Sequence, residues 1–115
     1  LAVAILGGLF IALRPEPAAP EPVVTPTAKV FELVVREGRL VSGPEVLKLT
    51  QGDAVVLRVT VDKRDELHLH GYDLSLHLLA NQPGELKFTA DRSGRFDYEL
   101  HHSHLDLGAL EVTPR

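Results

Sequence analysis

The sequence predicts an all-β protein, an antiparallel β-sandwich or barrel, and two observations carry this prediction. Apolar and polar residues alternate with a period of two through most of residues 28–115, as in strands that bury one face. Turn signals rich in Gly, Asp, Asn and Pro interrupt the alternation at short intervals, as between the strands of a sandwich. No segment shows the 3.6-residue period of a helix, so no helix is expected.

Seven or eight strands are expected, and the turns between them follow in order along the chain. The stretch KVFELVVREGRL is a strand that runs into a Glu-Gly turn, and EVLKLTQGD is a strand that ends in a Gly-Asp turn. AVVLRVTVD, DELHLH and DLSLHLLA follow, and the turns NQPG and DRSG bound the strand ELKFTA. RFDYELH then leads through the loop HSHLDLG to the last strand, ALEVT.

The alternation also predicts which side chains form the core. Residues two apart on one strand share a face, so the apolar member of each pair is expected to point inward. The expected core positions are Val55, Leu57, Val59, Val61, Leu67, Leu69, Leu74, Leu76, Leu78, Leu86, Phe88, Ala90, Phe96, Tyr98 and Leu100.

Composition excludes several functions. The chain has 115 residues and a formal net charge of −4, which argues against nucleic acid as a partner. It contains no Cys, so it has no disulfide, no thiolate nucleophile and no zinc ribbon. Ser75 and Ser103 lack a Gly-x-Ser-x-Gly setting, and neither a phosphate loop nor a dinucleotide fingerprint is present. We therefore expect the protein not to be an enzyme.

The first 27 residues differ from the rest of the chain. Residues 1–13, LAVAILGGLFIAL, form an uncharged apolar run that suits a signal segment or membrane anchor. Residues 14–27 are rich in proline and predict an extended linker. We expect residues 28–115 to fold as one domain at the periplasmic or extracellular face, either anchored to the inner membrane or secreted.

All six histidines lie in the second half of the chain, and five of them form two short clusters. In the stretch ELHLHG, Leu67 and Leu69 take the core face, so His68 and His70 share the other face about 7 Å apart. His101, His102 and His104 follow the strand RFDYEL. If the two strands end at the same pole, up to five imidazoles meet there. A sulfur-free nitrogen set favours Cu(II), followed by zinc or nickel.

Other residues near the clusters have simpler expected roles. His77 alternates with Leu76 and Leu78 in the middle of a strand and is expected to be a surface residue. Asp65 and Glu66 are expected to serve turn chemistry and solubility. Asp73 either caps a turn or orients an imidazole by a hydrogen bond.

The stretches GDAVVLRVTVDKRDELHLHGYD and GRFDYELHHSHLDLGALEV resemble the cupredoxin-like domains of bacterial exported proteins, over roughly residues 28–113. The resemblance implies a cupredoxin-like antiparallel β-sandwich of Greek-key type. It places His68 where the early copper ligand of that family belongs and the segment YELHHSHLDLGALEV where its ligand loop belongs. Glu99 or its neighbours stand in the region of the family's Cys, and the chain has neither Cys nor Met. A blue-copper site needs a thiolate, so the resemblance does not extend to blue-copper electron transfer.

These observations predict an exported, membrane-tethered protein that binds copper for handling, storage or delivery. Its ligands would be His68, His70, His101 and His104, with His102 as a substitute, and the ion would be Cu(II) or Cu(I) ahead of zinc. The alternative is a sandwich without metal that docks a protein of the cell envelope, with the histidines incidental. A copper enzyme is a third possibility, for which the sequence offers no substrate pocket.

Overall fold

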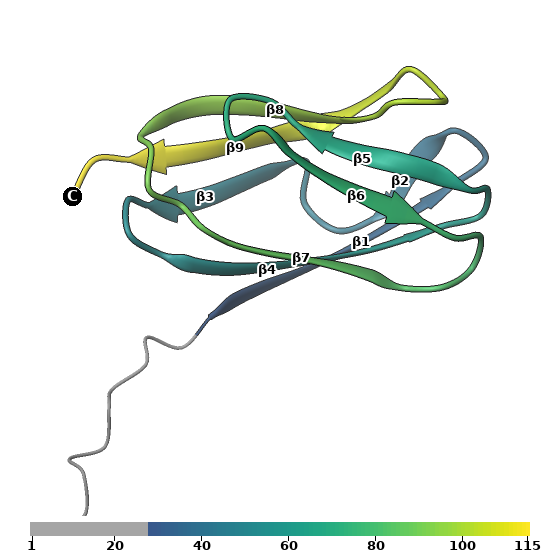
Figure 1. Ribbon diagram of the computed structural model, residues 1–115, viewed down its shortest axis with the longest axis horizontal. Helices are drawn as coiled ribbons and strands as arrows, with labels where there is room; N and C mark the ends of the chain where they lie inside the picture. Colours follow the sequence, from purple (N-terminus) through teal and green to yellow (C-terminus); the bar gives the residue numbers. More distant parts are fainter. Residues whose placement is uncertain (1–27) are drawn as a thin grey trace, which may run out of the picture.

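The structure is a computed structural model that describes residues 28–115, which form a two-layered β-sandwich (Figure 1). The predicted apolar segment 1–13 and the predicted linker 14–27 lie outside the described residues. Residues 28–115 contain no helix with the length and apolar character needed to cross a membrane.

Nine strands make up the described part of the chain. A four-stranded sheet has the order β2-β1-β4-β7, and a five-stranded sheet has the order β3-β9-β8-β5-β6. The strands are β1 (Lys29–Arg36), β2 (Arg39–Ser42), β3 (Val46–Thr50), β4 (Ala54–Val61), β5 (Asp65–Leu69), β6 (Leu74–Leu78), β7 (Gly84–Thr89), β8 (Gly94–Leu100) and β9 (Leu105–Thr113).

The all-β sandwich is confirmed, and the structure refines it in three ways. The first predicted strand is a hairpin of β1 and β2, and β9 begins inside the stretch expected to be a loop. Two of the pairings, β1 with β4 and β3 with β9, are parallel rather than antiparallel. The chain passes from one sheet to the other between β1 and β4, and such a crossover allows a parallel neighbour. The period-two pattern predicts faces, but it carries no information on pairing direction.

The core lies between the two sheets and consists mainly of Leu and Val. On β4 the predicted inward face, Val55 to Val61, is buried at every second residue. Leu67 and Leu69 of β5 are fully buried, as are Tyr98 and Leu100 of β8. Leu74, Leu76, Phe88 and Phe96 are only partly buried, because they pack at the margin of the core. The sequence therefore predicted the inward faces correctly.

Tyr98 of β8 and Gly108 of β9 connect the five-stranded sheet to the loop before β3. The Tyr98 hydroxyl donates to the carbonyl oxygen of Glu45 at 3.2 Å, and burial raises the pKa of this phenol to about 12. The backbone N–H of Ala109 donates to the same carbonyl at 3.0 Å. Gly108 has a φ of 153°, and a Cβ atom there would lie 1.9 Å from the Glu45 oxygen. Only glycine lets β9 approach the Glu45 carbonyl this closely.

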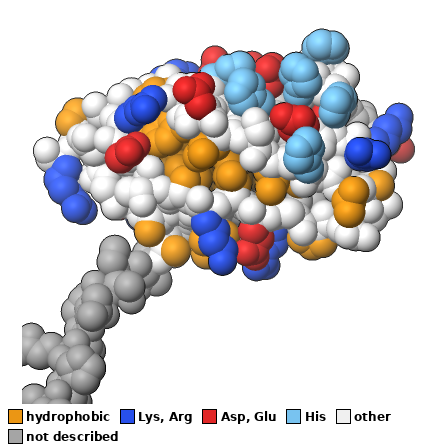
Figure 2. All heavy atoms as spheres, in the orientation of Figure 1, with side chains coloured by type: hydrophobic (Ala, Val, Ile, Leu, Met, Phe, Trp, Pro, Cys, Tyr) orange, Lys and Arg blue, Asp and Glu red, His pale blue; other side chains and the backbone are white. Residues whose placement is uncertain are grey.

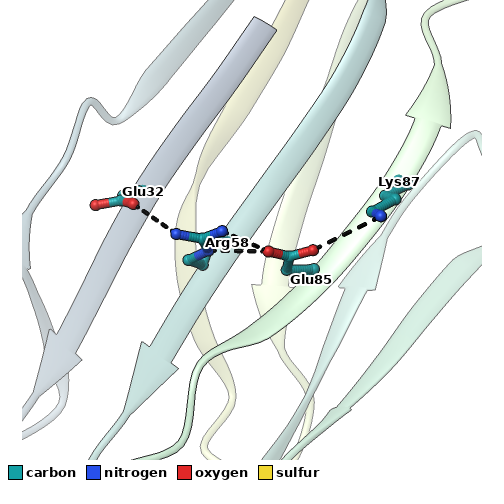
Figure 3. A network of polar contacts seen from close by, with 4 residues as sticks. All are labelled: Glu32, Arg58, Glu85 and Lys87. Carbon is teal, nitrogen blue, oxygen red and sulfur yellow. Dashed lines mark hydrogen bonds and ion pairs between the residues drawn. The ribbon is translucent and has the colours of Figure 1, made fainter. Parts of the chain in front are cut away.

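The outer face of the four-stranded sheet carries a ladder of ion pairs (Figure 3). Arg58 of β4 lies between two glutamates, with nitrogen to oxygen distances of 3.0 Å to Glu32 of β1 and 2.6 Å to Glu85 of β7. Lys87 is 3.9 Å from Glu85. The two Arg58 pairs are cross-strand contacts, the Lys87 pair lies within β7, and ion pairs at a surface of this kind each add little stability. None of the six histidines is on this sheet.

The close approach at Gly108 predicts a large effect of a single methyl group. Gly108→Ala should lower the free energy of unfolding by about 2–4 kcal/mol, because the new Cβ overlaps a backbone oxygen that cannot rotate away. Urea denaturation followed by circular dichroism measures this loss. Gly38→Ala is the matched control, since Gly38 also has a positive φ but no atom within 4 Å of an added Cβ. Its cost should be about 1–2 kcal/mol, from backbone strain alone. Equal losses in the two variants would contradict the steric explanation.

Candidate metal centre

The histidines lie on or beside the outer face of the five-stranded sheet, where acidic side chains separate them (Figure 2). Burial of Leu67 and Leu69 turns outward His68 of β5 and His70, the first residue after β5, as the alternation predicted. His68 is half-buried and His70 is exposed. Their rings are neighbours, with centroids 4.4 Å apart and planes tilted by 55°.

Glu99 of β8 completes the group. The register of β5 against β8 places Glu99 directly opposite His68. The Nε2 atom of His70 lies 2.9 Å from Oε1 of Glu99, within hydrogen-bonding distance of the carboxylate. Glu99 therefore touches one imidazole and faces the other across the strand pair.

These three residues offer a donor set that fits a metal ion. One ligand atom from each of His68, His70 and Glu99 lies within 4.8 Å of the other two. Two donors on one ion with bonds of about 2.0–2.1 Å are at most about 4.2 Å apart, so small side-chain rotations close the group. Among residues 28–115, no other three His, Asp or Glu side chains bring ligand atoms this close. Two imidazoles and a carboxylate suit a divalent ion such as Cu(II) or Zn(II).

The other predicted ligands, His101, His102 and His104, lie in the turn between β8 and β9. The N–H of His101 donates to the carbonyl of Glu66 at 2.8 Å, whereas the N–H of His70 donates to that of Asp97 at 2.9 Å. Positions 66 and 70 are about 13 Å apart along an extended strand. The two clusters therefore do not meet at one pole, and that expectation is wrong. β5 and β8 are antiparallel neighbours, so their carboxyl ends point to opposite ends of the sandwich (Figure 1).

The three loop histidines nevertheless lie close to one another and close to the start of β5, at Asp65 and Glu66. The ring centroids of His101 and His102 are 5.6 Å apart, and those of His101 and His104 are 6.4 Å apart. His104 has a left-handed backbone conformation, with a φ of 51°. Metal binding by these three histidines stays a prediction. His77 is exposed on β6, as expected for a surface residue.

Asp65 anchors the histidine-bearing turn. Its side chain is 3% exposed, and it accepts hydrogen bonds at 2.8 Å from the N–H groups of Glu66 and His102. The Ser103 hydroxyl donates to the other carboxylate oxygen. Burial alone would raise the pKa of Asp65, but the hydrogen bonds from Ser103, Glu66 and His102 outweigh it, and the pKa is lowered. The sequence interpretation missed this buried, ionised carboxylate.

The sequence interpretation missed the anchoring role of Asp65 and the place of Glu99 beside the histidines. Part of the signal for each was present in the sequence. Asp65 stands in phase with Leu67 and Leu69, so the alternation placed it on the buried face. Glu99 stands in phase with Asp97 on the outer face of β8. The partnership of Glu99 with His68 depends on the register between two strands, which a single sequence does not display.

The architecture is similar to that of several solved structures. Auracyanin A, a "blue" copper protein from Chloroflexus aurantiacus, is 15% identical with a TM-score of 0.60, and the match covers 75% of this chain and 99% of that one. The periplasmic domain of subunit II of cytochrome oxidase from Bradyrhizobium japonicum is 10% identical with a TM-score of 0.59, over 74% and 83% of the two chains. The blue copper oxidase from Nitrosomonas europaea is 19% identical with a TM-score of 0.61, over 75% of this chain and 39% of that one.

These likenesses establish the fold. The chain has a cupredoxin-like fold, and the predicted resemblance is confirmed at that level. This chain spans well under half of the blue copper oxidase. No family model matches the sequence, and no curated protein matches it either. The absence of Cys separates this chain from a thiolate-ligated copper site.

The anchoring role of Asp65 predicts a stability effect at a site remote from the main core. Asp65→Ala should lower the free energy of unfolding by at least about 2 kcal/mol, because it leaves buried donors without an acceptor. Asp97→Ala, at an exposed carboxylate of the same sheet, is the control and should change it by less than about 0.5 kcal/mol. Urea titration at neutral pH compares the two.

The same urea titrations of wild type and Asp65→Ala, repeated at acidic pH, test whether Asp65 is ionised in the fold. A pKa that is lowered on folding stabilises the protein above the unfolded value of about 3.9, and this contribution disappears as the pH falls toward the folded value. The difference between wild type and Asp65→Ala should therefore shrink in acid. A difference that stays constant from neutral pH down to about pH 3 would show that the carboxylate is not ionised in the fold.

Proposed function

We propose that this protein is an extracytoplasmic copper-binding protein that handles, stores or delivers copper and is not an enzyme. The observation that carries the proposal is the convergence of His68, His70 and Glu99 on one face of a cupredoxin-like sandwich. Proteins of this fold include one described as a "blue" copper protein and one described as a blue copper oxidase, which supports copper as the ion. An ion at this group would be held by His68 of β5, by Glu99 of the paired strand β8 and by His70, which follows β5 directly.

The electrostatic surroundings of the group favour a cation. Glu66 and Asp97 lie on the same outer face as the two imidazoles, and Asp106 pairs with Glu99 from β9. A cluster of carboxylates raises the local concentration of cations. The half-burial of His68 and Glu99 limits the freedom of two of the three donors, which reduces the entropy lost on binding. Copper ahead of zinc follows from the general order of affinities for such ligands.

The donor set argues against rapid electron transfer. A blue-copper centre requires a thiolate, and the chain has no Cys. Imidazole and carboxylate ligands stabilise Cu(II), and the exposed His70 leaves the group open to solvent. An open, exchangeable site suits loading and release of an ion. Cu(I) bound by the imidazoles alone is compatible with the same role.

Location outside the cytoplasm is part of the proposal. The apolar residues 1–13 and the proline-rich residues 14–27 support export and a tether to the inner membrane. A periplasmic domain is among the solved structures with this fold. A tethered domain with an outward-facing site could exchange its ion with a protein of the cell envelope.

Copper titration of variants tests the proposed ligands. His68→Ala should weaken Cu(II) binding more than about tenfold, or about 1.4 kcal/mol, because it removes one of the three donors of the group. Glu99→Gln should weaken it in the same direction while keeping the shape of the side chain. Isothermal calorimetry measures both. Glu85→Gln, on the outer face of the other sheet, is the matched control and should leave the affinity unchanged. Full affinity in His68→Ala and Glu99→Gln would refute the site, and no copper binding at all would favour the alternative of a docking module without metal.

The absence of a thiolate predicts the colour of the copper-loaded protein. It should show only weak ligand-field absorption, together with electron paramagnetic resonance parameters of tetragonal nitrogen coordination. Absorption spectroscopy of the Cu(II)-loaded chain makes this measurement. An intense absorption band at about 600 nm, as in copper–thiolate sites, would mean that the ligand assignment is wrong.

A further inference from the structure

A second set of the same donor types lies on the same face of the sheet, around Glu66, which is two residues before His68 on β5. Glu66 of β5 pairs with His77 of β6 on one side. On its other side the backbone carbonyl of Glu66 accepts the N–H of His101, the first residue after β8. Glu66 thus stands between two imidazoles, as Glu99 stands beside His68 and His70.

Strand pairing places these three residues next to one another on one face. Their ligand atoms do not all lie within 4.8 Å of one another, so side-chain rotation would have to close the group around an ion. Nδ1 of His77 lies 3.7 Å from Oε2 of Glu66. Glu66 and His77 are directly opposed on antiparallel strands, where Cβ atoms are about 4.5–5.5 Å apart. The backbone bond from the His101 N–H to the Glu66 carbonyl places His101 beside Glu66 on its other side. The Glu66 side chain is 26% exposed and that of His77 is 87% exposed, so the carboxylate is fixed and the imidazole is free to turn.

The buried carboxylate of Asp65 holds the backbone beside Glu66 and His101 in place. Asp65 accepts the N–H of Glu66 and the N–H of His102, so it fixes the chain beside both Glu66 and His101. His104, whose ring centroid is 6.4 Å from that of His101, is available as a fourth donor. A rigid backbone with mobile exposed rings is a suitable setting for capturing an ion from solvent.

We propose that Glu66, His77 and His101 form a second site for a divalent transition-metal ion, next to the group of His68, His70 and Glu99. This inference rests on the proposed copper-binding function. Glu66 and His68 are two residues apart on one strand face, so the two ions are about 7 Å apart. Each ion has its own carboxylate, which offsets part of the repulsion between them. The outer face of β5, β6 and β8 then binds two ions side by side.

Copper stoichiometry on the full chain tests the second site. Cu(II) titration by calorimetry should give two bound ions per chain, and electron paramagnetic resonance of the loaded protein should show dipolar coupling between them. His77→Ala and Glu66→Gln should each reduce the stoichiometry from two to one and abolish the coupling, while the affinity of the remaining ion is kept. His68→Ala should instead leave the second ion. Glu85→Gln, on the outer face of the four-stranded sheet, is the matched control and should keep both ions.

The outcomes separate this proposal from the previous one. One bound ion that is lost in His68→Ala and unaffected by His77→Ala would overturn the second site and leave the first standing. An ion that depends on His77 and Glu66 but not on His68 would support the second site and overturn the first. Two ions that both survive His77→Ala and Glu66→Gln would overturn the ligand assignment made here. Thermal unfolding of each metal-free variant checks that the fold is kept, and the exposure of His77 makes a large change unexpected.

Discussion

The buried carboxylate of Asp65 is the constraint on which the histidine-bearing surface depends. A charged group that is 3% exposed is tolerated only because donors surround it, here two backbone N–H groups and the Ser103 hydroxyl. Those donors belong to the start of β5 and to the turn after β8, two segments that are far apart in the sequence. Their fixed contact supports the register in which His68 faces Glu99. The positions of the metal-binding side chains therefore rest on an interaction below the surface.

The two outer faces of the sandwich serve different purposes although their strands are built in the same way. On the four-stranded sheet, Arg58 bridges two glutamates, so the charges satisfy one another. On the five-stranded sheet, imidazoles take the place of the cationic side chains beside Glu66 and Glu99. A neutral imidazole leaves the neighbouring carboxylate without a permanent counter-charge, and this leaves room for an external cation. The interior of Leu and Val is common to both faces and is independent of their chemistry.

The sequence was sufficient for the layers and faces and insufficient for the pairings between strands. Alternation alone placed Val55 to Val61 inward and His68 and His70 outward, because side-chain direction is a local property of a strand. The parallel pairing of β3 with β9 and the position of Glu99 opposite His68 depend on contacts between distant segments. The pairing of β8 with β9 is a further case, because its register shift between Tyr98 and Glu99 changes which residues face one another without a marked change in the sequence pattern.

The pairing of β3 with β9 also determines when the molecule can complete its fold. Val46 faces Ala109, 63 residues later in the sequence, and among the strands of residues 28–115 only β9 is a neighbour of β3 in the sheet. Closing so long a loop is entropically costly and slows folding. During synthesis from the amino terminus, β3 lacks a partner until the final strand emerges. The five-stranded sheet therefore stays incomplete until β9 is available to join β3 to β8.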